Sequence, residues 1–125
     1  MHKSKLAGFI VDCQTDDLQT AASFWSNALG MELRQLPGEE GEKYVELLDA
    51  SGDMHVEVQS VEHPSRVHLD IEIDDIDAEV ARLIELGAAE VKRVKRWCVM
   101  EAPTGQRFCV VTNRTDSFAD RANEW

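Results

Sequence analysis

The sequence predicts an α+β fold of two tandem βαβββ modules, which form an open, curved, barrel-like sheet with helices on its outside. The order of one strand, one helix and three short strands occurs twice, over about residues 5–61 and 66–113, with a tail at 114–125. The two helices also begin and end with similar residues. The first begins at Asp16-Asp17-Leu18 and ends at Leu29-Gly30, and the second begins at Asp74-Asp75-Ile76 and ends at Leu86-Gly87. One such module buries too little apolar surface to be stable alone, so we expect both in a single domain, 1–125.

Each predicted helix carries its own start and stop signals. Apolar residues recur at helical spacing from Leu18 and again from Ile76. Asp16 or Asp17 can cap the first helix, and three aspartates crowd the start of the second, where the helix dipole favours negative charge: Asp74, Asp75 and Asp77. A glycine follows each apolar stripe, at Gly30 and at Gly87, where a helix commonly ends. The sequence therefore predicts helices that begin near Leu18 and Ile76.

The predicted strands alternate between apolar and polar residues, which separates two faces of the sheet. In the strand 66–73 the odd residues Leu69, Ile71 and Ile73 are expected to pack on the helices, so the even ones point the other way. The same phase places a set of mostly polar residues on the face away from the helices: Ile10, Asp12, Glu57, Gln59, His68, Asp70, Arg107 and Cys109. This pattern fits a sheet that lines a cavity, and it fits equally a sheet with one face in water.

Loops and ends give weaker predictions. Hairpin or turn signals occur at 37–41, 50–53 and 103–106, a linker at 62–65, and His55 and His63 are expected to be exposed. The tail is either a short helix that packs Phe118 and Trp125 or a disordered end. The basic run 92–96 is either an edge strand protected by charge or a local anion site.

Composition limits the classes of partner. Twenty-four acidic and 13 basic residues give a net charge of −11, which repels polyphosphates, so neither nucleic acid nor an anionic membrane is an expected partner. The cysteines are odd in number and lack CxxC spacing, which is typical of reduced thiols: Cys13, Cys98 and Cys109. With no apolar run of membrane-spanning length and no signal peptide, a cytoplasmic location is the default expectation.

Four segments together resemble the glyoxalase-like proteins of the vicinal oxygen chelate superfamily, which includes glyoxalase I, bleomycin resistance proteins and extradiol dioxygenases. These segments are Asp17–Gly30, Arg66–Ile71, Leu86–Ala88 and Ala102–Val110. The resemblance spans about residues 5–113 and implies paired βαβββ modules and a homodimer. It implies little about chemistry, because the superfamily hosts isomerases, lyases, dioxygenases, epimerases and metal-free drug-binding proteins.

The resemblance also implies positions for a metal site, near Gly8 and at Glu57, His68 and Cys109. Glu57 and His68 match the expected ligand types, whereas glycine has no donor and cysteine replaces a common glutamate. A catalytic divalent ion needs three or more protein ligands and an open position. The expectation is therefore no cofactor, or one Zn, Ni, Mn or Fe ion held weakly by Glu57 and His68; a Cys109 thiolate would favour zinc over magnesium or manganese.

Two functional hypotheses follow, with no catalytic residue assigned. The favoured hypothesis is a protein that binds a small organic molecule in a cleft, without a complete metal site; the alternative is a glyoxalase-type lyase or isomerase that depends on a divalent metal. A purely structural partner module is a third possibility. Within the cleft, Asp12 and Asp70 are a candidate acid/base pair, and Cys109 is a candidate nucleophile beside His68. Arg66 and Arg107 are candidate clamps for a carboxylate or phosphate of a ligand, or the partners of nearby acids.

Overall fold

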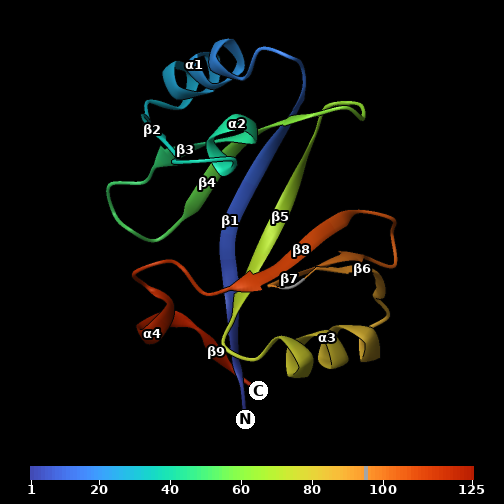
Figure 1. Ribbon diagram of the computed structural model, residues 1–125. Coiled ribbons are helices and arrows are strands. Elements are labelled where there is room, and N and C mark those ends of the chain that lie inside the picture. The colour runs from blue at the N-terminus through green and yellow to red at the C-terminus, as the bar shows by residue number, and fades with distance from the viewer. Residues whose placement is uncertain (95) are drawn as a thin grey trace. The chain divides into compact units, whose positions relative to one another are not determined.

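The computed structural model describes residues 1–94 and 96–125 (Figure 1). Lys95, part of the predicted basic run, lies outside the described residues. The strands are β1 (Lys3–Gln14), β2 (Glu32–Gln35), β3 (Tyr44–Leu48), β4 (His55–Val61), β5 (Arg66–Ile73), β6 (Ala89–Val94), β7 (Trp97–Glu101), β8 (Arg107–Thr112) and β9 (Asn123–Glu124). The helices are α1 (Leu18–Leu29), α2 (Glu40–Lys43), α3 (Ile76–Glu85) and α4 (Phe118–Arg121).

The predicted α+β class is confirmed, with an open sheet. Hydrogen-bonded strands follow the order β2-β3-β4-β1-β5-β8-β7-β6, and β9 pairs with β1. The path begins at β2 and ends at β6, so the sheet does not close on itself. Both halves of the chain run strand, helix and three strands, as the sequence repeat predicts, and α2 is an addition within the first half. Among the described residues, no helix is both long and apolar enough to span a membrane.

The chain forms two compact units, which we describe separately. Unit 1 contains Met1–Gly8 and His68–Trp125, and unit 2 contains Phe9–Val67. Each unit has its own apolar core: Val45, Leu47, Val56 and Val58 pack under α1 in unit 2, and Met100, Cys98 and Val110 pack under α3 in unit 1. In Figure 1, α1 lies against β3 and β4, and α3 lies along β6, β7 and β8.

Aspartates begin both helices, and the structure identifies Asp17 and Asp75 as the residues that cap them. Asp17 accepts a hydrogen bond from the Thr20 backbone N–H (3.1 Å), and Asp75 accepts one from Ala78 (3.1 Å). These bonds satisfy N–H groups that have no partner within the first turn of a helix. Gly30 then ends α1 in the left-handed conformation, with φ 67°. Gly87 follows α3 with φ 108°, and the N–H groups of Gly87 and Ala88 donate to the carbonyls of Ile84 (2.9 Å) and Leu83 (3.0 Å), so a glycine ends this helix too. Local chemistry therefore sets all four predicted helix boundaries.

Two sequence-based predictions need correction here. Leu69 is 52% exposed instead of packed in the core, because the unit 1 core under α3 begins further along β5, at Ile71 and Ile73. The loop predicted at 37–41 contains the start of α2. Of the two interpretations of the tail, the short helix is confirmed: Phe118 is buried in α4, and β9 follows it.

Candidate functional site

The polar face of unit 1 gathers three metal-ligating side chains from two adjacent strands. His68 and Asp70 are two residues apart on β5, so both point to the same face. β8 runs parallel to β5, and its Cys109 lies directly across from Asp70. One ligand atom from each of these three residues lies within 4.8 Å of the other two. We call this set the His68–Asp70–Cys109 cluster.

The cluster is shielded but accessible. The side chain of His68 is 14% exposed and that of Asp70 is 5% exposed, with His68 Nε2 lying 3.5 Å from Asp70 Oδ1. Cys109 is half-buried and has no disulfide. These side chains are therefore largely shielded from solvent, although they belong to the polar face of the sheet.

The donor set suits a transition-metal ion. It offers an imidazole nitrogen, a carboxylate oxygen and a sulfur, which are the three ligand types that zinc accepts. Ligands at about 2.0–2.3 Å from one tetrahedral ion lie about 3.5 Å from each other. Rotations of the side chains that draw the donor atoms inward by about 1 Å would meet that geometry, and three ligands leave a fourth position for water or substrate.

Glu72, the next residue on the same face of β5, has a structural role. Its carboxylate is fully buried and accepts hydrogen bonds from the backbone N–H groups of Arg114 (2.7 Å) and Thr115 (2.9 Å), from the Thr115 hydroxyl, and from Lys5 Nζ (3.1 Å). Burial alone would raise the pKa of Glu72, but these donors outweigh it and lower the pKa below its usual value. Glu72 therefore fixes the chain after β8 and is not a free donor for a ligand.

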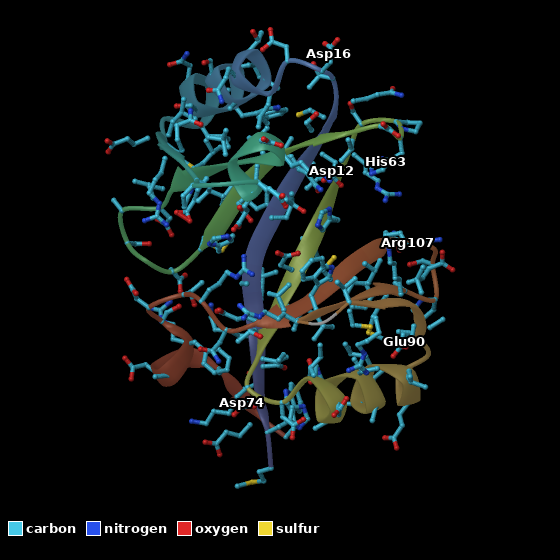
Figure 2. All side chains as sticks on the ribbon, in the orientation of Figure 1. Asp12, Asp16, His63, Asp74, Glu90 and Arg107 are labelled. Carbon is cyan, nitrogen blue, oxygen red and sulfur yellow. The ribbon has the colours of Figure 1, made fainter. Side chains whose placement is uncertain are left out.

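Arg107 is held by an acid. It lies at the start of β8 (Figure 2), and its Nε donates to Glu101 Oε1 across the β7–β8 pair at 3.0 Å. The guanidinium of Arg107 is therefore paired with an acid, which is the second of the two roles that the sequence left open for it.

Unit 2 carries a second polar group, around Glu57. Glu57 and Glu46 lie directly across from each other on β4 and β3, and both are buried. His55 lies between them, with Nε2 at 3.1 Å from Glu57 and Nδ1 at 3.5 Å from Glu46, and Arg34 also pairs with Glu46. The expectation that His55 is exposed is therefore wrong, since its side chain is 15% exposed. His63 is half-buried as well.

The remaining predicted residues of the site also lie in unit 2. Asp12, labelled on β1 in Figure 2, is 2% exposed, and its carboxylate lies 3.8 Å from Arg66 Nε. Ile10 is buried, and Gln59 donates to the Tyr44 hydroxyl at 2.9 Å. Glu57 belongs to unit 2 and His68 to unit 1, so a metal site shared by that pair stays a prediction, as does an acid/base pair of Asp12 and Asp70.

Asp70 is the functional candidate whose ligand role sequence reasoning missed. The sequence indicates Asp70 as a candidate acid, and the resemblance does not include it among the metal ligands beside His68. The signal was present, because residues i and i+2 of a strand share a face. What the sequence could not supply was the β5–β8 register that brings Cys109 opposite Asp70.

Comparison with known proteins decides the family. The sequence profile of the glyoxalase-like domain matches residues 8–111. The chain belongs to the glyoxalase-like domain family. The resemblance noted in the sequence is thereby confirmed over most of the chain, and no curated protein matches this glyoxalase-like chain.

Solved structures show the same fold at low sequence identity. Methylmalonyl-CoA epimerase from Mycobacterium tuberculosis is 16% identical, with 87% of each chain covered and a TM-score of 0.64. A hypothetical protein from Bacillus halodurans is 10% identical, covering 97% of this chain and 99% of its own, with a TM-score of 0.65. A methylmalonyl-CoA epimerase in complex with methylmalonyl-CoA and NH4+ is 16% identical, covering 89% and 95%, with a TM-score of 0.60.

Proposed function

We propose that this glyoxalase-like protein binds a small organic molecule through one divalent metal ion held by His68, Asp70 and Cys109, and acts as an isomerase or lyase. The observation that carries the proposal is the convergence of three different donor atoms within 4.8 Å on one sheet face. The sequence alone favoured metal-free binding because it offered two ligands, Glu57 and His68. In unit 1, Asp70 joins His68 and Cys109 as a third donor, which favours a metal site over metal-free binding.

The charge of the cluster determines which molecule it accepts. A bound divalent ion would act as a Lewis acid that polarises a substrate oxygen and acidifies the neighbouring carbon. Asp70 alone would repel an anionic or oxygen-rich ligand, whereas the cluster loaded with a cation attracts it. The proposed substrate is therefore a compound with neighbouring oxygen atoms, which agrees with the acyl-CoA ligand of an epimerase of the same fold.

A metal-binding measurement tests this proposal. We expect elemental analysis of the purified protein to find a divalent metal, and Zn²⁺, Ni²⁺, Mn²⁺ or Fe²⁺ to raise the melting temperature of the apoprotein. At a free concentration of 100 times Kd, binding adds about 2.7 kcal/mol to the free energy of unfolding, which corresponds to roughly 10 °C here. The shift should vanish in His68→Ala, which removes the imidazole, and persist in His63→Ala, since His63 lies in the loop before β5 with its Nδ1 2.8 Å from the Pro64 carbonyl. Absence of bound metal and of any shift would refute the proposal.

Metal-free binding is the second candidate function, and one observation favours it. His68 Nε2 and Asp70 Oδ1 lie 3.5 Å apart. When His68 is protonated, the two side chains stabilise each other as an ion pair that needs no metal ion between them. This candidate predicts that no metal changes the melting temperature and that a ligand with a hydrogen-bond donor or a positive charge stabilises the protein instead. A screen of amines and polyols by thermal shift on the apoprotein distinguishes the two functions.

A further inference from the structure

We infer that the metal site of unit 1 is thiophilic, with Cys109 as a thiolate ligand that selects Zn²⁺ or Co²⁺ over Mn²⁺ or Mg²⁺. The inference rests on the proposed function and specifies its metal. It concerns a position of this chain where cysteine stands on the polar face, directly across from a carboxylate.

The sheet fixes the direction of the Cys109 side chain. β8 lies between β5 and β7, and Cys109 pairs with Asp70 on one side and Val99 on the other. Its neighbours on β8, Phe108 and Val110, pack into the core under α3. Because successive side chains of a strand point to opposite faces, Cys109 points away from α3, toward the face that carries His68 and Asp70.

The other two cysteines differ in their surroundings. Cys98 is fully buried in the core of unit 1, and burial raises the pKa of its thiol. Cys13 lies in unit 2 with Sγ 3.7 Å from the Val11 carbonyl, and burial raises the pKa of its thiol too. Of the three cysteines, Cys109 is the one that groups with a histidine and a carboxylate. Cys13 is therefore a matched control, half-buried like Cys109 but outside the cluster.

Charge and softness both favour a thiophilic ion. A neutral imidazole, a carboxylate and a thiolate together carry two negative charges, which one divalent cation neutralises. Net neutrality matters here because Asp70 is 4% exposed, and an unbalanced charge at such a site is costly. Sulfur ligands favour zinc and cobalt, whereas magnesium and manganese prefer sites made only of oxygen.

Cobalt provides the test, since a thiolate bound to Co²⁺ gives a sulfur-to-metal charge-transfer band in the near ultraviolet. The reduced apoprotein is titrated with Co²⁺ as wild type, Cys109→Ser and Cys13→Ser. We expect the band in wild type and in Cys13→Ser, and its loss in Cys109→Ser. Zn²⁺ and Mn²⁺ affinities, measured by competition against a chromophoric chelator, complete the experiment.

The selectivity arm uses Cys109→Glu, which supplies an oxygen donor at the same position. Any nitrogen and oxygen site prefers Zn²⁺ to Mn²⁺ to some degree, so the informative quantity is the change in the ratio of affinities. We expect this ratio to fall at least about tenfold from wild type to Cys109→Glu, in keeping with the preference of sulfur for zinc. Circular dichroism of each apoprotein verifies that the variants fold.

The outcomes separate the inference from the proposed function. Cobalt that binds without a charge-transfer band, or an unchanged Zn²⁺ to Mn²⁺ ratio in Cys109→Glu, overturns the thiolate ligand and leaves the metal-dependent function standing. A band that is lost in Cys13→Ser assigns the sulfur to Cys13 and also overturns the inference. A folded wild-type protein that binds none of these metals overturns the proposed function itself.

Discussion

Replacing Glu79 with glutamine is expected to lower the free energy of unfolding by about 3 kcal/mol at neutral pH. Glu79 lies on α3 with its side chain fully buried. Arg82 donates to both of its carboxylate oxygens, from Nε at 2.8 Å and from Nη2 at 2.9 Å. His2 Nε2 lies 2.7 Å from Oε1. Removal of the charge leaves the guanidinium without its bidentate partner, so the loss is larger than that of an exposed pair.

The Glu79 cluster also joins the two ends of the chain to α3. The Arg82 guanidinium stacks on the Trp125 ring, 3.8 Å from its centroid, and Trp125 Nε1 donates to Ser4 Oγ at 2.8 Å. The backbone of His2 pairs with that of Trp125, next to the β1–β9 pair. We therefore expect hydrogen exchange in β9 and at the start of β1 to increase in Glu79→Gln.

The pH dependence gives an independent measure of the same interaction. Burial alone would raise the pKa of Glu79, but hydrogen bonds from Arg82, His2 and Ser4 lower it from 4.5 to about 2. The unfolded chain therefore binds a proton first, and the stabilisation is complete above pH 4.5 and is lost as pH falls toward 2. The shift corresponds to about 3 kcal/mol. The free energies of unfolding of wild type and Glu79→Gln, measured with urea, should therefore converge as the pH falls over this interval.

Glu85→Gln is the matched control for Glu79→Gln, because Glu85 is an exposed residue near the end of the same helix. We expect its free energy of unfolding to lie within about 0.5 kcal/mol of wild type. A Glu79→Gln variant as stable as this control at pH 7 would show that the buried ion pair contributes nothing to stability.

The elements of this fold could be predicted where the signal is local. Asp17 and Gly30 cap α1 through bonds to residues within one or two turns, so the sequence shows both partners. The alternation of apolar and polar residues along β5 likewise places His68 and Asp70 on the same face of the strand. These are short-range relations, and they survive without knowledge of the tertiary structure.

Predictions failed where the outcome depended on distant residues. Leu69 alternates in phase with Ile71 and Ile73, yet it is 52% exposed, because the core of unit 1 begins further along the strand, at Ile71 and Ile73. His55 appeared to be an exposed strand residue, but the register of β3 against β4 places two acids around it. The cluster at Cys109 is of the same kind, since only the parallel β5–β8 pairing reveals it. Strand register is set by packing across the sheet, which a single sequence does not display.

Met100→Ala is expected to produce the other large effect, a loss of about 2–5 kcal/mol in the free energy of unfolding. Met100 is fully buried in β7, across from Phe108 of β8, and packs in the core of unit 1 with Cys98 and Val110. Truncation removes its apolar contacts and leaves a cavity between the sheet and α3. Equilibrium unfolding in guanidinium chloride measures the loss.

The same substitution tests whether the core positions the cluster on the opposite face. Phe108 and Val110 flank Cys109 on β8, so a cavity beneath them frees the strand to shift and should weaken metal binding at the His68–Asp70–Cys109 cluster while the protein is still folded. Val91→Ala is the control, because Val91 on β6 is 43% exposed and its truncation should change stability by less than about 0.5 kcal/mol. If Met100→Ala costs no more than Val91→Ala, the packing of α3 on the sheet is not what holds β8 in register.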